Sequence, residues 1–506
     1  MKIKRLSGAL SVILMISILA SCGAGSVSSD TTAGNSGSDN VSESEAATTE
    51  LKPDLPEYDG KGREFNILGK MEGDMSGRWT ALDLYVEEQN GDTVNDAVYD
   101  RNIAIESKYN VDIKATYMSI GGQYSYAMYS EITKLMMAGE NEYDFIMPTI
   151  QDAALLARDG LLYDLNTVGN VDLTKPWWNQ QFNSDVNIGG KSYYGNGDIC
   201  MAFIRASYCI LFNKQIVEDY GVTNPYEMVE DGTWTIDNML IEAAKFASDT
   251  NGDGSYTAAD NVGLGVLDNH VEVFYSASGN KFVTYDDKND KFTFTGGSER
   301  SIGVLEKILK IYTSDDNVIC FTNKSKWSPE LSGDHVNAAA QTFEAGRLLF
   351  LAGTMNNVPT MRGMETDFGI LPYPKYDEEQ AKYYTYVQTW ASGCAAIPIN
   401  VKDLNASSII LEDMAYYSKQ YVTPAFYDTA LKGKYARDNE SLQMLDLICE
   451  NRTCDIGNLF NIGKLISGIT SNINAGTGNF ASLIASKQSE IDETLAEITE
   501  LYSKND

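Results

Sequence analysis

The chain has 506 residues, 71 of them acidic and 39 basic, which gives a formal net charge of −32 at pH 7. A protein this acidic is repelled by nucleic acid and by anionic lipid headgroups, so polyanions are excluded as its natural partners. Its length allows two or more lobes, each with a substantial core.

The N-terminus has the pattern of a bacterial export signal. Three basic residues within the first five positions precede an uncharged, mostly apolar run from Ala9 to Ala20. A transmembrane helix needs about 20 apolar residues, so this run is too short to span a bilayer in the mature protein. The run ends in Leu-Ala-Ser-Cys at 19–22, which resembles a bacterial lipoprotein signal. We therefore expect residues 1–21 to be removed and Cys22 to carry the lipid; the alternative is an ordinary signal peptide with an incidental cysteine.

Residues 22–57 are predicted to be a flexible linker attached to the lipid. The part after Cys22 contains no aromatic residue and is dominated by Ser, Gly, Thr, Ala and acidic side chains. Such a segment buries too little apolar surface to offset its ordering entropy. The linker should hold a folded body, which begins near Tyr58, on the extracellular face of the cytoplasmic membrane. No later segment contains 18 uninterrupted apolar residues, so a second membrane crossing is not expected.

The first half of the body alternates strand-like and helix-like patterns, which predicts an α/β fold. The expected elements are a strand at 64–68, a helix at 94–109, a strand at 111–115, a helix at 129–137 and a strand at 143–147. This β-α-β-α-β order predicts a parallel sheet with right-handed crossovers. Ligands of such open sheets bind at the carboxyl ends of the strands.

Further elements are expected along the rest of the chain, and no internal repeat is evident. They are strands at 207–212 and 262–266, a hairpin of 282–285 with 291–294, and helices at 236–247, 301–312, 409–421 and 483–502. The acidic turn of the hairpin is interpreted as a solvated turn.

Apart from Cys22 the chain has six cysteines, too few for a disulfide framework in a body of this size. They stand at positions 200, 209, 320, 394, 449 and 454. The sequence has only two histidines and no C-x-x-C spacing, which argues against a zinc site. We expect mostly free, buried thiols.

Six passages in the right order resemble the extracellular solute-binding protein family 1, the carbohydrate-binding proteins of bacterial ABC importers. They are 143–148 with 159–165, 190–194 with 210–214, 233–234, 343–347, 368–374 and 390–399. Each passage alone is a weak signal, but together they cover roughly residues 60–430.

The resemblance implies a two-lobed, type II periplasmic-binding-protein-like fold with a ligand between the lobes. Lobe 1 would comprise 58–170 and 372–425, and lobe 2 would comprise 171–371 and 426–506. Hinge closure would report occupancy to the permease subunits of an ABC transporter. The implied function is a non-enzymatic receptor for a carbohydrate, most simply an oligosaccharide. The alternatives are a receptor for a peptide or another small solute, and a surface glycoside hydrolase, which would need two carboxyl groups about 5–9.5 Å apart.

A candidate calcium loop follows the helix expected at 236–247. Oxygen-bearing side chains stand at loop positions 1, 3, 5, 7 and 12, with glycine at position 6, the spacing that wraps calcium in oxygen ligands. The candidate ligands are Asp249, Asn251, Asp253, Ser255 and Asp260. Aspartate in place of glutamate at position 12 departs from the EF-hand pattern, and a strand follows where a second helix would stand. We expect a structural calcium ion; the alternative is an acidic turn.

Ligand contacts are expected from aromatic and planar polar side chains, because sugars combine apolar C–H faces with hydroxyl groups. The aromatic candidates are Trp177, Trp178 and Trp390. Gln151 and Asp152 occupy the places of the sugar-contacting acid and base that the resemblance implies, although Pro148 replaces the tryptophan of maltodextrin-binding relatives. Asp198, Arg205 and Asn356 are added because they flank strands expected to end at the ligand.

Overall fold

A computed structural model describes residues 51–71, 80–121, 125–140, 142–427 and 438–503. The predicted signal peptide, Cys22 and nearly all of the linker lie outside these residues. The chain divides into a unit that ends at Leu51 and a second unit, Lys52–Asp506, to which all elements below belong. None of the helices in the described part of the chain is both long and apolar enough to cross a membrane.

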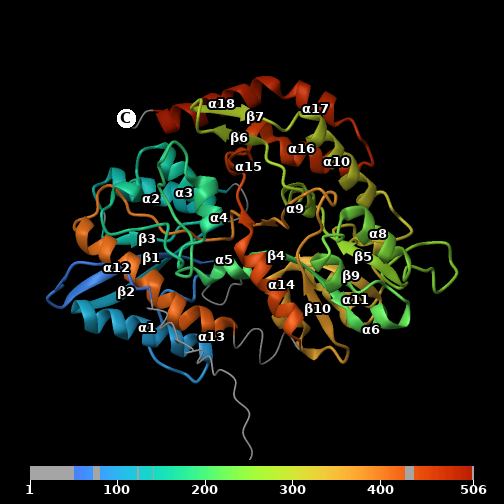
Figure 1. Cartoon of the computed structure of the whole chain (residues 1–506), viewed down its shortest axis with the longest axis horizontal. Coiled ribbons are helices and arrows are strands. Elements are labelled where there is room, and N and C mark those ends of the chain that lie inside the picture. The colour runs from blue at the N-terminus through green and yellow to red at the C-terminus, as the bar shows by residue number, and fades with distance from the viewer. Residues whose placement is uncertain (1–50, 72–79, 122–124, 141, 428–437, 504–506) are drawn as a thin grey trace, which may run out of the picture. The chain divides into compact units, whose positions relative to one another are not determined.

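The predicted parallel sheet is confirmed. Among the described residues it has the strand order β2-β1-β3, and β1 pairs in parallel with both neighbours. Its strands are β1 (Arg63–Met71), β2 (Val111–Ser119) and β3 (Phe145–Ile146), linked by α1 (Thr93–Tyr109) and α2 (Ala127–Met137). Phe65, Ile67 and Leu68 of β1 are fully buried. Figure 1 shows this group in blue and cyan.

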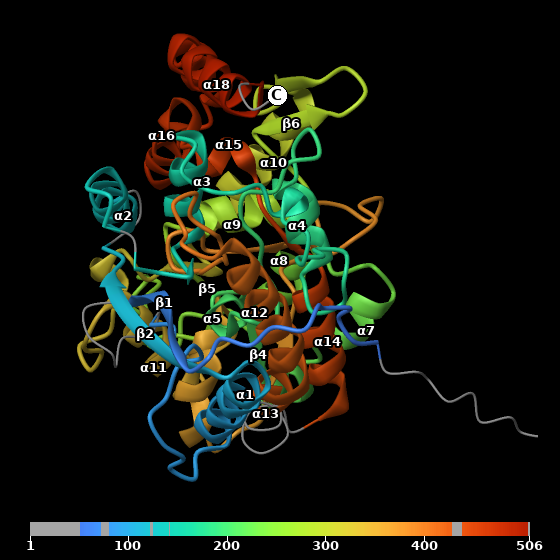
Figure 2. The ribbon, with the colours of Figure 1, turned by 90° about the vertical axis from the view of Figure 1, so that its left-hand side faces the viewer.

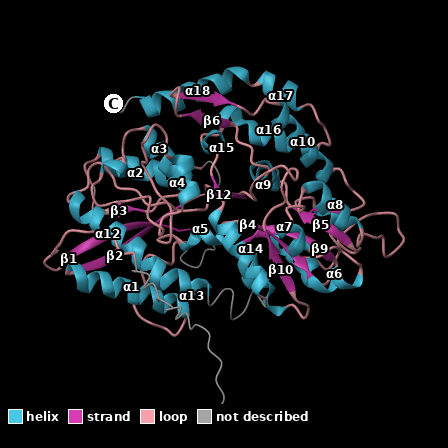
Figure 3. Ribbon diagram, in the orientation of Figure 1, coloured by secondary structure: helices cyan, strands magenta, loops and turns pink. Residues whose placement is uncertain are grey.

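A second sheet, with the order β10-β4-β9-β5-β8 in the described chain, is mixed. Its strands are β4 (Tyr208–Asn213), β5 (Val262–Val266), β8 (Val318–Cys320), β9 (Leu348–Thr354) and β10 (Phe368–Leu371). Strand β5 runs parallel to β8 and β9, whereas β4 runs antiparallel to β9 and β10. Every residue of β4 and β5 is buried, and Figure 3 shows helices around these strands.

Helices and short pairs complete the unit. The helices are α3 (Ile150–Arg158), α4 (Gln180–Val186), α5 (Met201–Arg205), α6 (Lys214–Asp219), α7 (Pro225–Glu230), α8 (Ile236–Ala244), α9 (His270–Ala277), α10 (Glu299–Tyr312), α11 (His335–Glu344), α12 (Leu404–Tyr417), α13 (Thr423–Tyr427), α14 (Asn439–Glu450), α15 (Ile456–Leu459), α16 (Leu465–Asn474), α17 (Phe480–Ser486) and α18 (Gln488–Ser503). The small pairs are β6 (Val283–Asp286) with β7 (Lys291–Phe294), as expected for the hairpin, and β11 (Thr385–Tyr386) with β12 (Arg452–Thr453).

Two expected helices differ in the structure. The helix expected at 409–421 begins earlier as α12, and it continues as a π-helical turn, η4 (Ser418–Val422). The hydroxyl of Ser418 accepts a hydrogen bond from the buried Arg101 of α1 and donates one to the Met414 carbonyl, so the change of helix type coincides with a tertiary contact. Figures 1 and 2 show α12 and α13 near α1. The helix expected at 483–502 is two helices, α17 and α18, separated at Lys487.

Residues 387–396 are the part of the fold that positions the site, and we call them the crossing segment. Val387 pairs with Ser207 beside the second sheet, whereas Gly393 pairs with Thr149 just after the first sheet. Ala396 exchanges backbone hydrogen bonds with Ile146 of β3. One segment is therefore tied to strands or loops of both sheets. The lobe boundaries expected from the sequence remain a prediction.

The prediction of free thiols is confirmed for the six cysteines of the described residues, five of which are buried.

A buried carboxylate, Glu412 of α12, organises the segment before α4. Its two oxygens accept hydrogen bonds from the indole N–H groups of Trp177 at 2.8 Å and Trp178 at 2.9 Å. Burial raises the pKa of Glu412 to about 7. The carboxylate thus accepts from the N–H groups of two buried indoles.

We predict that Glu412→Gln destabilises the protein by about 1–3 kcal/mol, because an amide cannot accept from both indoles and one buried N–H is left unsatisfied. The free energy of unfolding from urea titration measures the effect. The matched control is Glu131→Gln, at an exposed side chain paired with Lys134, which should change stability by less than about 0.5 kcal/mol. Equal effects of the two substitutions on the free energy of unfolding would contradict the structural role assigned to Glu412.

Candidate ligand-binding site

A cavity of about 310 Å³ lies where β5 and β9 end. These two strands are parallel, so their carboxyl ends share one edge of the second sheet. The chain enters the cavity wall directly after β5, at Leu267 and Asn269, and directly after β9, at Asn356 and Asn357. We call this space the carboxyl-edge cavity. It is at the kind of position where open α/β sheets bind their ligands.

Both histidines of the chain line the carboxyl-edge cavity, each at the first position of a helix. His270 is 2% exposed and packs edge-on against Tyr208, with ring centroids 5.6 Å apart. Its Nδ1 accepts a hydrogen bond from the backbone N–H of Leu267 at 3.3 Å. Burial, aided by the nearby His335, lowers the pKa of His270 to about 3, so this ring is neutral.

Asn356 is fixed by a second predicted residue, Arg205. The Nη2 and Nε atoms of Arg205 donate to Asn356 Oδ1 at 2.8 and 3.2 Å. Burial lowers the pKa of Arg205. The guanidinium thus orients the amide of Asn356 at the cavity wall, and the structure brings these two predicted residues together with Trp390.

Trp390 and Gln388 of the crossing segment line the same cavity. Within the described part of the chain, the buried Oε1 of Gln388 has no hydrogen-bond partner. The half-buried Trp390 supplies an indole surface. A residue with an indole surface and a residue with an unsatisfied acceptor therefore line the same cavity.

The predicted residues Gln151 and Asp152 belong to α3, which contacts the crossing segment. Both side chains are buried, and the backbone N–H of Gln151 donates to the Thr389 carbonyl at 3.3 Å. Asp152 accepts from the Tyr129 N–H at 3.0 Å and from the Thr149 hydroxyl. Burial raises its pKa. The Gln151 backbone thus contacts the segment that carries Trp390, and neither residue is among those that line the cavity.

Trp178 and Asp198 line a different cavity of about 520 Å³ near α13 and α14. Asp198 accepts from the Thr423 hydroxyl at 2.7 Å and faces Lys419 Nζ at 3.6 Å; burial raises its pKa. Trp177 is buried against Tyr416 of α12. The structure therefore does not bring these three predicted residues to the carboxyl-edge cavity.

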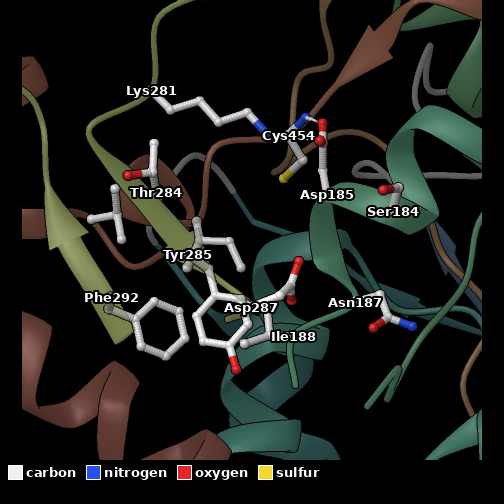
Figure 4. A pocket seen from close by; sticks show the side chains of 12 residues that line it. Ser184, Asp185, Asn187, Ile188, Lys281, Thr284, Tyr285, Asp287, Phe292 and Cys454 are labelled. Carbon is white, nitrogen blue, oxygen red and sulfur yellow. Dashed lines mark hydrogen bonds and ion pairs between the residues drawn. The ribbon is translucent and has the colours of Figure 1, made fainter. Parts of the chain in front are cut away.

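A smaller cavity, of about 230 Å³, lies between the end of α4 and the β6–β7 hairpin (Figure 4). Two of its charged groups, Asp185 and Lys281, are paired with each other. Asp185 accepts from Lys281 at 2.7 Å, from the Thr453 hydroxyl at 2.6 Å and from the Cys454 N–H at 2.9 Å. These contacts join α4 to the hairpin and to β12, which is a structural role.

The candidate calcium loop forms a compact turn, and Gly254 at loop position 6 adopts a φ of +75°. Asp249 accepts from two loop N–H groups at 2.8 and 2.9 Å, while Asn251 and Asp253 each accept one. Asp260 is buried and accepts from Thr250 and Thr257. In the described chain no group of three or more His, Cys, Asp or Glu side chains is arranged to hold a metal ion. The donor atoms are the oxygens that calcium prefers.

Sequence reasoning missed His270, His335 and Gln388 as candidate site residues. A usable signal existed for His270, which follows the strand at 262–266 by four positions. Gln388 stands two positions before a tryptophan that was selected. His335 belongs to a helix that approaches the cavity only through the tertiary fold.

We predict that His270 makes the folded protein less stable at acid pH. Its folded pKa of about 3 lies below the ordinary 6.5, so the unfolded chain binds more protons between these values. The stabilisation is complete above pH 6.5 and is lost as the pH falls towards 3. One pH unit corresponds to about 1.4 kcal/mol. Relative to His270→Gln, the native protein should therefore lose about 2–3 kcal/mol between pH 7.5 and 4.5 in urea unfolding. Parallel pH profiles of the two proteins would refute this.

Comparison with known proteins agrees with this architecture. A protein-family model described as bacterial extracellular solute-binding protein matches residues 74–398. No curated protein matches the sequence.

Solved structures show the same fold at low sequence identity. An ABC substrate-binding protein from Listeria monocytogenes in complex with cycloalternan has 12% identity and a TM-score of 0.53, with 86% of this chain and 99% of that chain covered. A cyclo/maltodextrin-binding protein complexed with maltotetraose has 13% identity and a TM-score of 0.54, with 88% and 98% covered. A sugar transporter from Rhizobium etli in an open conformation has 15% identity and a TM-score of 0.55, with 87% and 98% covered. The expected α/β, periplasmic-binding-protein-like fold is confirmed, and the chain belongs to the bacterial extracellular solute-binding protein family.

Proposed function

We propose that this protein is a non-enzymatic receptor that captures a carbohydrate, most simply an oligosaccharide, and delivers it to an ABC importer. The observation that carries the proposal is the carboxyl-edge cavity, in which the indole of Trp390 lies near polar side chains. A sugar ring stacks its C–H face on an indole while its hydroxyl groups bond planar amides. Asn356, held by Arg205, and Gln388 supply such amides.

The similar structures support this ligand class. Two of those proteins were solved in complex with cycloalternan and with maltotetraose. The cavity lining includes one carboxylate, Asp334, which caps α11 by accepting from the Asn337 N–H at 2.9 Å. A glycosidase of the usual kind needs two carboxyl groups at the scissile bond. Capture therefore suits this site better than hydrolysis.

We propose further that Cys22 is lipidated and that residues 22–57 tether the body to the extracellular face of the cytoplasmic membrane. The lipoprotein-like end of the signal at residues 19–22 supports this proposal. The permease subunits of the ABC transporter would be the protein partners.

The ligand prediction is tested by isothermal titration calorimetry with neutral oligosaccharides, short peptides and amino acids. We expect an oligosaccharide to bind, and Trp390→Ala to weaken its binding about 10- to 100-fold, because a buried aromatic anchor contributes about 2 kcal/mol or more. Tyr220→Ala is the control, at an exposed aromatic ring outside the cavity. Binding of peptides or amino acids without any response to carbohydrate would reject the sugar assignment. Hydrolysis of a bound glycan would favour the alternative of a surface glycoside hydrolase.

We also propose that the loop from Asp249 to Asp260 holds a structural calcium ion. Asp249, Asn251, Asp253, Ser255 and Asp260 would be its ligands, and the metal would stabilise the loop after α8. Binding would require some of their oxygens to exchange N–H donors for the ion. The loop residues are not among those that line the carboxyl-edge cavity, so the ion should have little effect on sugar affinity.

Calcium should raise the melting temperature of the native protein and a chelator should lower it. A ligand that binds only the folded state adds about 2.7 kcal/mol at a hundredfold excess over its dissociation constant. Asp253→Ala should abolish the shift, whereas Asp287→Ala, at another exposed acidic turn, should retain it. An unchanged native melting curve would mean that the loop is only an acidic turn. Loss of sugar binding together with the ion would place the metal at the ligand.

A further inference from the structure

Two residues that line the carboxyl-edge cavity offer polar atoms of opposite hydrogen-bonding character, and the first of these atoms has no partner within the described residues. One is Oε1 of Gln388, which can only accept. The other is Nε2 of His270. Because Nδ1 of His270 accepts from the Leu267 N–H, the neutral ring carries its proton on Nε2, which can only donate.

Both side chains are held firmly. Gln388 is 6% exposed and His270 is 2% exposed. Tyr208 packs against the His270 ring, and its neighbour Ser207 pairs with Val387, the residue before Gln388. The donor and the acceptor therefore lie on elements that are joined through Ser207 and Tyr208, where β4 begins.

We propose that His270 Nε2 and Gln388 Oε1 form a donor–acceptor pair that selects neutral, hydroxyl-bearing ligands and rejects carboxylate and ammonium ligands at the same position. The inference rests on the proposed function and deepens it. A hydroxyl group can accept from His270 and donate to Gln388 at once. A carboxylate cannot donate to Gln388, and an ammonium group cannot accept from His270.

The charges around the cavity support the same selection. Among the described lining residues there is no lysine or arginine, and the single carboxylate, Asp334, is engaged as a helix cap. The Arg205 guanidinium is directed to Asn356. The basic side chains that remain in this lining are His335 and the neutral His270, so an anionic ligand would gain no ion pair from a lysine or arginine there. A buried polar group left without its partner in the complex weakens binding, which strengthens the selection.

The first test needs no ligand. Because the chain has only two histidines, ¹⁵N-histidine labelling gives two ring systems, and His335→Gln leaves the signals of His270 alone. At pH 6 we expect a neutral imidazole protonated on Nε2. An imidazolium, or a neutral ring protonated on Nδ1, would overturn the proposal whatever the protein binds.

The second test compares neutral gluco-, galacto- and manno-oligosaccharides with a galacturonic acid trimer and a glucosamine trimer, by calorimetry at pH 7. We expect a neutral glycan to bind at least 100-fold more tightly than either charged trimer. Gln388→Met, which removes the acceptor at similar volume, should weaken that binding at least tenfold, and Gln215→Met, at an exposed residue of α6, should not. The His270 ring signals should shift when the glycan is added.

The outcomes separate this inference from the proposed function. Equal binding of a neutral glycan to the native protein and to Gln388→Met would show that the pair does not select the ligand, and so would binding that leaves the His270 signals unshifted. After either result the proposal of a sugar receptor would remain. If the galacturonic acid or glucosamine trimer binds best, the selection is wrong while a carbohydrate receptor remains. If no glycan of any charge binds, the proposed function fails and this inference fails with it.

Discussion

The site depends on the backbone pairing of the crossing segment. Residues 389–396 exchange hydrogen bonds with the start of α3 and with β3, including Ile150 N–H to the Ser392 carbonyl at 3.0 Å. At its other end the segment pairs with Ser207, which precedes the buried strand β4. Trp390 lies between these attachments. Its position is therefore set by the parallel sheet on one side and by the mixed sheet on the other.

This arrangement explains why the cavity combines residues distant in sequence. Because β5 and β9 are parallel, His270 and Asn356 lie at the same edge of the second sheet. The crossing segment adds Gln388 and Trp390 to the cavity lining. A change in the relative position of the two sheets would alter the distance between Trp390 and Asn356. The geometry thus suits a receptor of the hinge-bending class, in which a ligand stabilises one arrangement of the lobes.

Local patterns predicted the elements well because their signals are local. The first β-α-β-α-β run and the hairpin follow from apolar periodicity and turn composition. The apolar pattern of a helix does not predict which of its residues are buried where tertiary contacts determine burial. Ile103 of α1 is apolar and yet 41% exposed, whereas Arg101 of the same helix is fully buried and donates to Leu84 and Ser418. No local periodicity shows that a charged residue will find partners from two distant segments.

The candidate site was only partly predictable for the same reason. Asn356 was selected because it flanks a strand expected to end at the ligand, and Trp390 was selected as an aromatic residue in a passage that resembles the family. Both line the cavity. Trp177 and Trp178 carry the same chemical signal, yet Glu412 from more than 200 positions along the chain binds both indoles in the interior. Residue type indicates what a side chain can bind; the partner it meets is decided by packing between distant segments.

A crystal structure of the protein with a bound oligosaccharide tests the central claim most directly. The account predicts ligand density in the carboxyl-edge cavity, with a sugar ring against the indole of Trp390 and a hydroxyl group within hydrogen-bond distance of Gln388 Oε1. Ligand density in the cavity lined by Trp178 and Asp198, with the carboxyl-edge cavity free of ligand, would contradict it.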